Sequence, residues 1–538
     1  MKFIYSKSKN VYDYLCMKHD TRINVIVNII RTLVLTLLSF ITFPWVCRYL
    51  GDSMVGAYTW ANTFVAYFLI LAKIGIPNLA VRECVKVRDD KEKLSNKAQG
   101  FFLLQLISTM ISFALMCAVV FSVPAIRDSS ALIFILSINF IVGAFSFEWI
   151  FIALEKQFYM SVRSIVALTL CAILVIVFVT TPSDVYIYAL VTASVTVLTA
   201  IANIFYVRKF ISFKKTMPYS FKEYVRPLFV LCSLSLIISL YNQTDTFILG
   251  FISNEKAQAA TDAVAIKGAR EVANYSVGIK GIDIIIGIFA NLSTVFIPRA
   301  AYYYQQEDKK YFNNLTKYSM NICFFIVLPA IVTMAILSRP ICSLISGNFD
   351  YSTANGSYQS APIVLITLCS MMLTYSLGEI IYGQILLPMK KEKYYLIAIG
   401  GGTLLNIGLS ILFGAVLPKY ISWMTPAIGV AIGTATTDLI IIIFLISLTW
   451  KWVKNAIFNL NTLKLVIASL IILGISLGLY KPFEMLWGNL KISQSAAAIL
   501  QMVSIVFIDA IVYLLFLGLT KEKLVYSFLK KKPAEVQQ

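Results

Sequence analysis

The sequence predicts an all-α protein that crosses a membrane many times. Of its 538 residues, 59% are hydrophobic and only 14% are charged, whereas soluble domains carry about 25% charged residues. Apolar runs recur about every 35 to 40 residues, and each can supply the roughly 20 residues that a spanning helix needs. Stretches such as 189–202 are largely apolar throughout, unlike the alternating segments of about ten residues that build outer-membrane barrels. The spans are therefore expected to be helices.

Apolar segments bounded by charged or turn-forming residues mark the expected spans. Fourteen such segments occur, at 23–47, 57–81, 98–122, 130–154, 162–181, 185–207, 226–252, 272–298, 316–338, 361–388, 394–417, 425–449, 464–480 and 494–519.

Basic residues predict the orientation of these spans. With fourteen spans, the segments on the side of the two termini carry 34 Lys and Arg, and the opposite loops carry 9. Cytoplasmic loops are enriched in Lys and Arg, so both termini are expected in the cytoplasm. The formal net charge of +19 is thus a topology signal and does not indicate a nucleic-acid partner.

A basic, aromatic segment after the sixth span indicates two lobes. The expected parts are a cytoplasmic segment at 1–22, a first lobe at 23–207, a cytoplasmic linker at 208–225, a second lobe at 226–449, two further spans within 450–519 and a cytoplasmic tail at 520–538. Residues 1–22 lack the apolar core of a signal peptide, so no cleavage is expected.

Enzyme chemistry has little support in the sequence. The nine cysteines show no C-x-x-C spacing and the single histidine, His19, precedes the first span, so neither a disulfide framework nor a zinc site is expected. No Walker-type phosphate loop occurs, and no cofactor is expected. A membrane polymerase or glycosyltransferase would need acid–base or metal-binding residues in an outer loop, and the outer loops reach only about twenty residues.

Ionisable residues inside the spans are the candidate functional residues, because charges there are costly and usually face a cavity or a partner. Arg31 in the first span shares a helical face with Asn24 and Asn28, and Lys73 in the second shares a face with Asn62. The alternative for Arg31 and Lys73 is that they extend to lipid phosphates at the membrane surface.

The seventh and eighth spans carry charges of both signs. Asp245 lies in the seventh span, with Asn242 on the adjoining face. Lys280 and Asp283 lie three residues apart on the eighth, where they can form an ion pair, and Lys280 can alternatively pair with Asp245. Carboxylates at Asp245 and Asp283 are candidates for binding a coupling cation.

Three more carboxylates, Glu379, Asp438 and Asp509, lack a basic partner in their own spans. Each could bind a proton or Na⁺, but such residues more often hydrogen-bond a neighbouring helix. Aromatic residues near span ends, Trp60 and Tyr275 among them, are expected mainly in the interfacial belt, with contact to a sugar ring as the alternative.

Several motifs resemble one family. The stretch Ile74-Gly75-Ile76-Pro77, with Arg82-Glu83 and the charged run 86–94, resembles the end of span two and the first cytoplasmic loop of bacterial polysaccharide flippases. The stretches 245–250, 275–280 and 296–299 resemble the same proteins around spans seven and eight. These belong to the Wzx/PST branch of the multidrug/oligosaccharidyl-lipid/polysaccharide exporter superfamily. Lys73 and the insertion-like segment 254–270 depart from that pattern.

This resemblance implies two six-helix lobes in a V-shaped arrangement, with spans one, two, seven and eight lining a cavity. It implies that the chain is no enzyme but a flippase that moves an undecaprenyl-pyrophosphate-linked oligosaccharide to the outer leaflet. Arg31, Lys73 and Lys280 would then bind the pyrophosphate, since Arg and Lys provide permanent charge and several donors. Expected partners are membrane lipids, H⁺ or Na⁺ and polysaccharide polymerase machinery. A lipid II flippase or multidrug exporter of the same superfamily is the alternative.

Overall fold

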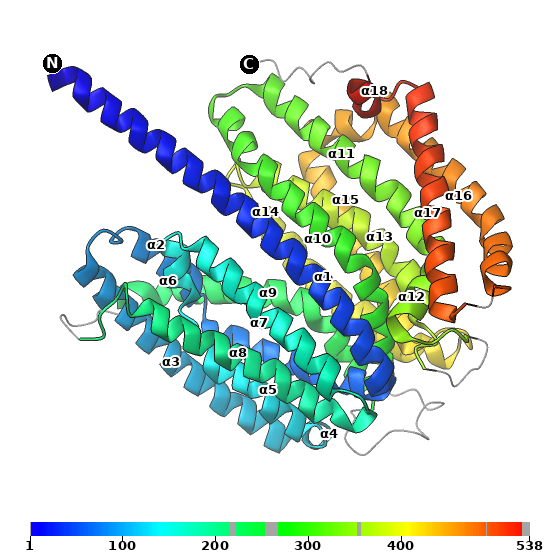
Figure 1. Ribbon diagram of the computed structural model, residues 1–538, viewed down its shortest axis with the longest axis horizontal. Coiled ribbons are helices and arrows are strands. Elements are labelled where there is room, and N and C mark those ends of the chain that lie inside the picture. The colour runs from blue at the N-terminus through cyan, green and yellow to red at the C-terminus, as the bar shows by residue number, and fades with distance from the viewer. Residues whose placement is uncertain (1, 215–221, 253–266, 352–356, 491, 530–538) are drawn as a thin grey trace. The chain divides into compact units, whose positions relative to one another are not determined.

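The computed structural model describes residues 2–214, 222–252, 267–351, 357–490 and 492–529 (Figure 1). Every regular element within these ranges is a helix, so the all-α prediction is confirmed. The chain divides into two compact units. Unit 1 contains residues 1–50 and 61–236, and unit 2 contains residues 51–60 and 237–538. The grouping of spans into six, six and two stays a prediction.

Unit 1 is built from the long first helix and the helices that follow it. They are α1 (Lys2–Lys73) outside residues 51–60, α2 (Ile76–Val85), α3 (Lys91–Ser122), α4 (Pro124–Arg127), α5 (Ser130–Gly143), α6 (Glu148–Ala153), α7 (Gln157–Phe178), the 3₁₀ turn η1 (Pro182–Asp184), α8 (Val185–Val207) and the first half of α9 (Lys222–Phe251). Helix α5 packs on α3 and α8, and α8 packs on α7 (Figure 1).

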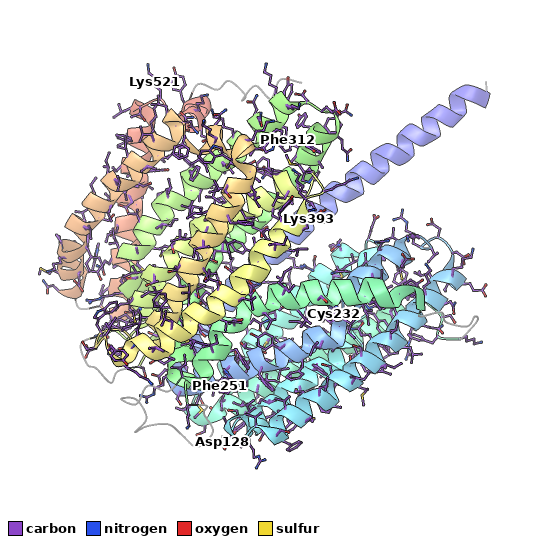
Figure 2. All side chains as sticks on the ribbon, turned by 180° about the vertical axis from the view of Figure 1, so that it is seen from behind. Asp128, Cys232, Phe251, Phe312, Lys393 and Lys521 are labelled. Atoms are coloured by element: carbon purple, nitrogen blue, oxygen red, sulfur yellow. The ribbon has the colours of Figure 1, made fainter. Side chains whose placement is uncertain are left out.

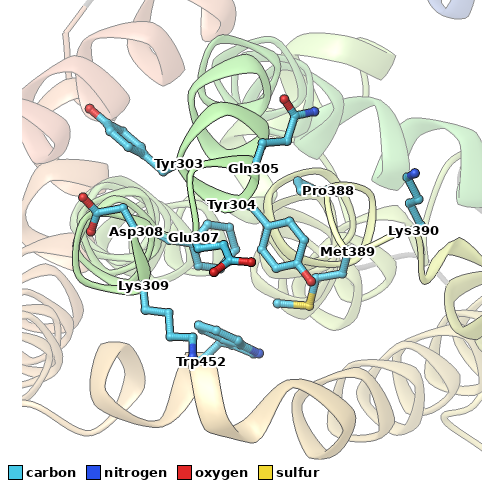
Figure 3. Close-up of a pocket in the computed structure, with 11 residues that line it drawn as sticks. Tyr303, Tyr304, Gln305, Glu307, Asp308, Lys309, Pro388, Met389, Lys390 and Trp452 are labelled. Carbon is cyan, nitrogen blue, oxygen red and sulfur yellow. The ribbon is translucent and has the colours of Figure 1, made fainter.

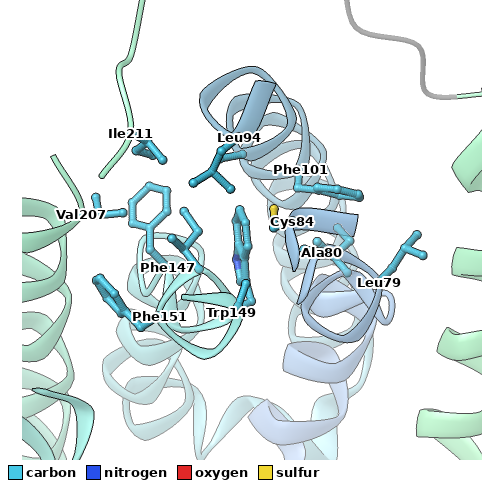
Figure 4. Close-up of a cluster of buried hydrophobic side chains, with 14 of the residues drawn as sticks. Leu79, Ala80, Cys84, Leu94, Phe101, Phe147, Trp149, Phe151, Val207 and Ile211 are labelled. Carbon is cyan, nitrogen blue, oxygen red and sulfur yellow. The ribbon is translucent and has the colours of Figure 1, made fainter. Parts of the chain in front are cut away.

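The short turns of unit 1 are held by side-chain and ring contacts. Asp90 caps α3 by accepting the backbone N–H groups of Glu92 and Lys93, both at 3.1 Å. The bond from the Lys93 N–H is the main reason that the pKa of Asp90 lies below its usual value. In the adjacent core the Trp149 ring lies 6.2 Å from Phe101 and 6.4 Å from Phe147 (Figure 4). This packing holds α3 and α6 together.

Unit 2 contains the remaining helices. They are the second half of α9, α10 (Ala269–Gln305), α11 (Lys309–Ile336), α12 (Ser338–Ser346), α13 (Ala361–Ile380), the π-helical segment η3 (Ile381–Leu386), α14 (Glu392–Ile411), the π-helical segment η4 (Leu412–Val416), the 3₁₀ turn η5 (Leu417–Lys419), α15 (Pro426–Ile457), α16 (Leu460–Gly488), α17 (Gln494–Leu519) and α18 (Lys523–Leu529). Helices α10, α13 and α15 pack together (Figure 1), and α16 packs on both α11 and α17.

A ten-residue segment of α1, from Gly51 to Trp60, belongs to unit 2. Gly51 interrupts the helix with φ 73° and ψ 172°, a conformation that favours glycine. At Gly56 a Cβ atom would lie 1.7 Å from the Ala269 carbonyl oxygen, so only glycine allows this approach. Trp60 is fully buried, donates from Nε1 to the Phe247 carbonyl at 3.2 Å, and packs edge-on against Phe251. The expectation of a belt position is therefore wrong for Trp60.

Eleven helices in the described ranges are long and apolar enough to span a membrane. One of them, Val34–Val85, has 52 residues and covers the second expected span and part of the first, while α9 and α10 are not among the eleven. The chain is thus a multi-pass membrane protein, and the count of fourteen stays a prediction. Within unit 2, Phe312, Lys393 and Lys521 lie towards one end and Phe251 lies at the other (Figure 2). Three of the segments expected in the cytoplasm therefore share one end.

Candidate functional site

A buried cluster of oxygen atoms surrounds Asp245 on α9. Asp245 is 5% exposed, and its Oδ2 accepts hydrogen bonds from the Tyr275 hydroxyl of α10 at 2.5 Å and the Thr434 hydroxyl of α15 at 2.8 Å. The Asn406 side chain of α14 donates to the Thr434 hydroxyl at 3.2 Å. Four helices of unit 2 thus meet at one carboxylate.

Three oxygen atoms of this Asp245 cluster have no hydrogen-bond donor among the described residues. They are Asp245 Oδ1, Asn406 Oδ1 and Ser410 Oγ, and Asn406 and Ser410 face the carboxylate from successive turns of α14. A buried oxygen without a partner costs about 1–3 kcal/mol, so these atoms are suited to bind something else. Oxygen ligands suit hard cations, and the single negative charge of this cluster can be balanced by a proton or one monovalent cation.

Divalent metals have less support. In the described ranges no group of three or more His, Cys, Asp or Glu side chains is placed to hold a metal ion. The cluster instead combines one carboxylate with an amide and hydroxyls from Asn406, Ser410, Thr434 and Tyr275. These residues therefore favour a singly charged ligand.

Of the two pairings expected for Lys280, the structure shows the one with Asp283 on the same helix, α10. Lys280 Nζ lies 3.4 Å from Asp283 Oδ2, with the two side chains 25% and 46% exposed. The alternative partner for Lys280, Asp245, accepts instead from the two hydroxyls described above. Asn242, three residues before Asp245 on α9, is exposed. Asp245 and Asp283 thus differ in surroundings, since one is enclosed by oxygens and the other is half-exposed beside a cation.

Two of the three carboxylates without a basic partner in their own spans bond neighbouring helices, as expected. Asp438 accepts a hydrogen bond from the Tyr241 hydroxyl of α9. Asp509 on α17 accepts from the Ser476 hydroxyl of α16 at 2.6 Å and the Thr333 hydroxyl of α11 at 3.0 Å. Glu379 is half-buried on α13.

The other predicted site residues belong to unit 1. Arg31 is half-buried on α1, and its Nε is enclosed without an acceptor among the described residues. Asn62 is exposed, and so is Lys73, the last residue of α1. The side chains of Asn24 and Asn28 and residues 253–266 lie outside the described part of the chain. The convergence of these residues with Lys280 on one cavity therefore stays a prediction.

Sequence reasoning missed most of the residues around Asp245. Tyr275 is 2% exposed and bonded to Asp245, so its assignment to the interfacial belt is wrong. Asn406 and Ser410 lie four residues apart in an apolar span, and this spacing places two polar side chains on one helical face. That pattern could have pointed to α14, but it could not have named Asp245 as the partner.

Comparisons with solved structures show the class of fold. The structure of the lipid II flippase MurJ in an inward closed conformation matches 94% of this chain and 99% of its own, with a TM-score of 0.66 and 17% identity. An inward-facing multidrug resistance MATE family transporter of the MOP superfamily matches 80% of this chain and 99% of its own, with a TM-score of 0.57 and 17% identity. The chain therefore has the same fold as these two proteins.

Sequence comparison shows the family. The chain belongs to the family described as polysaccharide biosynthesis protein, which it matches over residues 22–303. It is also 23% identical over 220 residues to a protein of Escherichia coli (strain K12) described as "Putative O-antigen transporter". That match covers 40% of this chain and 53% of the relative, so it spans about half the length of the curated protein. These relatives are transporters and flippases rather than enzymes.

Proposed function

We propose that the protein is a flippase for a lipid-linked oligosaccharide used in surface polysaccharide assembly. Its substrate would be an undecaprenyl-pyrophosphate-linked repeat unit, moved from the inner to the outer leaflet of the bacterial cytoplasmic membrane. Family membership supports the link to polysaccharide synthesis, and the transporter fold supports translocation. The basic segments at one end of unit 2 support an orientation with both termini in the cytoplasm.

The Asp245 cluster is the main support for the proposal that transport is coupled to a cation. Alternating access needs a ligand with different affinities for the two states. Asp245 bonds helices α10 and α15 and faces α14, so a change in its charge alters the contacts of four helices at once. Binding of H⁺ or Na⁺ at Asp245 would therefore be coupled to the packing of unit 2. Asp283 is the second candidate, in which a cation would compete with Lys280.

The cationic residues would bind the head group of the substrate. Arg31 offers a guanidinium whose Nε has no acceptor among the described residues, and Lys73 is exposed at the end of α1. Lys280 is a permanent cation on α10, paired with Asp283 at 3.4 Å. A pyrophosphate needs this combination of permanent charges and multiple donors.

Reconstituted flipping tests the proposal. The full chain is placed in proteoliposomes with the polyprenyl-pyrophosphate-linked oligosaccharide, and arrival in the other leaflet is measured with imposed H⁺ or Na⁺ gradients. We expect flipping that responds to one gradient and is lost in Asp245→Asn. Flipping that is unchanged when both gradients are collapsed would show that cation coupling is wrong.

A lipid II flippase is the second candidate, because the MurJ fold covers nearly the whole chain. Deleting the gene distinguishes the two functions. Accumulation of a lipid-linked polysaccharide repeat unit in the inner leaflet supports the proposal, whereas accumulation of lipid II supports the second candidate. If the protein is instead a multidrug exporter, cells lacking the gene should accumulate neither lipid. If the protein flips a polysaccharide repeat unit, polysaccharide polymerase machinery would receive that unit in the outer leaflet.

A further inference from the structure

A pocket opens at the end of unit 2 where α10 meets α11. It has a volume of about 630 Å³, within the range of about 300–1,000 Å³ usual for small-ligand sites. Its walls come from the end of α10, the turn into α11, the turn after η3, and α15. Figure 3 shows the side chains of Tyr304, Glu307, Lys309, Met389 and Trp452 around a central space.

Aromatic rings form much of the wall. The Trp452 ring packs edge-on against Phe312 at 5.2 Å, and Phe312 contacts Tyr304 at 5.7 Å. Phe312 is 1% exposed, whereas Trp452 is half-buried and Tyr304 is 38% exposed. A buried ring thus holds two partly exposed rings in place, and the Lys451 ammonium lies over the Trp452 ring at 5.9 Å from its centre.

The charges that line the pocket sum to zero. Glu307 and Asp308 are acidic, and Lys309 and Lys390 are basic. No ion pair within 4 Å joins these four side chains to one another or to other described residues. Asp308 is occupied as the cap of α11, accepting the Tyr311 N–H at 3.1 Å. Glu307, Lys309 and Lys390 therefore remain available as hydrogen-bonding groups.

Two of these charged side chains stand on rigid turns. Glu307 and Lys390 both have φ 55°, and the next residue in each turn bonds back five positions, from Asp308 N to Tyr303 O at 3.1 Å and from Lys391 N to Leu386 O at 2.9 Å. This is the Schellman arrangement of a helix end, in which a non-glycine residue at the left-handed position is strained. The turns thus hold charged side chains at fixed places on the pocket rim.

We propose that this pocket binds the saccharide part of the lipid-linked substrate at the cytoplasmic surface. Pyranose rings present C–H faces that pack on indole and phenol rings, and hydroxyls that bond carboxylates, amides and ammonium groups. A lining of zero net charge matches an uncharged, hydroxyl-rich ligand better than a free diphosphate. The exposed charges of Glu307 and Lys309 disfavour a lipid tail.

The position of the pocket agrees with this ligand. Its lining residues come from segments 299–317, 390–393 and 451–464 or directly adjoin them, and the basic residues of these segments predict a cytoplasmic location. The sugar of a lipid carrier in the inner leaflet projects from the membrane on that side. The inference rests on the proposed function and adds a glycan site on unit 2, separate from the cationic residues proposed for the pyrophosphate.

Binding of the free glycan tests the inference. The probe is the oligosaccharide released by mild acid from the polyprenyl-linked lipids of the host bacterium, titrated into the purified full chain in detergent by calorimetry. We expect Trp452→Leu and Glu307→Gln each to raise the Kd about tenfold, as losing a stacked ring or a charged hydrogen bond should. Excess inorganic pyrophosphate should leave glycan binding unchanged.

Matched controls are present in the same chain. Trp450 lies on the same helix, outside the pocket, and is 43% exposed, so Trp450→Leu should leave the Kd within about twofold. Glu155 occupies an equivalent turn of unit 1 with φ 56°, and Glu155→Gln should behave likewise. Glu307→Gly removes the carboxylate while relaxing its turn, so it should weaken binding without lowering thermal stability.

Three outcomes would overturn the inference. They are no binding of the glycan to the wild type, equal losses in the pocket variants and their controls, and displacement of the glycan by pyrophosphate. Loss of flipping in Trp452→Leu without any glycan binding would point instead to a protein partner. If flipping occurs without Trp452-dependent glycan binding, this inference fails and the proposed function stands. If the glycan binds but no lipid-linked glycan is flipped, the proposed function is wrong and the inference that the pocket binds a glycan still holds.

Discussion

Buried and half-buried carboxylates are bonded differently in the two units. In unit 1, Glu83 lies between Lys86 at 2.5 Å and Lys97 at 2.9 Å. Glu148, which is exposed, also lies 2.6 Å from a cation, Arg163. In these pairs, a permanent cation balances the carboxylate.

In unit 2 two buried carboxylates accept hydrogen bonds from hydroxyl groups. Asp245 is bonded by Tyr275 and Thr434, and Asp509 by Ser476 and Thr333. The ion pairs of unit 2, Lys280–Asp283 and Arg270–Asp52, involve other residues.

This difference indicates which unit can respond to an ion. Removing the charge of Glu83 would leave lysines unbalanced, so its charge is tied to the fold. A carboxylate held only by hydroxyls can take up a proton or exchange a cation without leaving a buried positive charge behind. We therefore expect ion coupling in unit 2 and structural ion pairs in unit 1.

The largest expected effect is the loss of transport in Asp245→Asn. The amide keeps the size of the side chain but cannot carry a negative charge, so coupled flipping in proteoliposomes should fall by more than about tenfold, or at least 1.4 kcal/mol. Glu83→Gln in unit 1 is the control, and its flipping per folded molecule should stay within about twofold. If Asp245→Asn flipped at the wild-type rate, the assignment of ion coupling to unit 2 would be wrong.

The cationic residues should follow with losses of about tenfold. Arg31→Ala and Lys280→Ala each remove a charge proposed to meet the pyrophosphate, where a charge-assisted hydrogen bond is worth about 1.5–3 kcal/mol. Export of the repeat unit should fall while the amount of protein in the membrane is unchanged. Arg31→Lys should keep partial activity, because lysine lacks the two-pronged contact of arginine. Full export in both alanine variants would exclude a cationic head-group site.

Asp509→Ala should affect stability more than transport. It removes two bonds between α17 and its neighbours, each worth roughly 0.6–1.7 kcal/mol within membranes. The free energy of unfolding, measured by denaturant titration in mixed micelles, should fall by about 1–3 kcal/mol. Ser476→Ala should lose about half as much, since one bond remains. If Asp509→Ala instead abolished cation-coupled flipping without lowering the free energy of unfolding, Asp509 would be an ion-binding residue like Asp245.

The smallest effects are expected from the lysines of unit 1. The Lys97 side chain is 28% exposed and that of Lys86 is 54% exposed, so solvent screens the second pair more strongly. Lys97→Met should lower the free energy of unfolding by about 0.5–1 kcal/mol and Lys86→Met by less than about 0.5 kcal/mol. The same denaturant titration measures both. If Lys86→Met lowered the free energy of unfolding as much as Lys97→Met or more, burial would not decide the strength of these ion pairs.

Composition and local spacing determined the class of protein. Long apolar runs predict helices because a lipid-exposed backbone must satisfy its own hydrogen bonds, and the structure contains such helices throughout its described ranges. The pair Lys280–Asp283 was also predictable, because its geometry depends only on the pitch of one helix. The motifs around spans two, seven and eight pointed to the family that the comparison identifies.

Only the tertiary structure decided the partners of Asp245. Tyr275, Asn406 and Thr434 lie 30, 161 and 189 residues further along the chain, and no local period relates them to Asp245. Whether their side chains meet depends on how four helices rotate about their axes and pack. The same holds for the segment from Gly51 to Trp60, which lies within a helix of unit 1 by sequence and packs with unit 2. Its place depends on contacts such as Gly56 with Ala269, which exist only once α1 and α10 have come together.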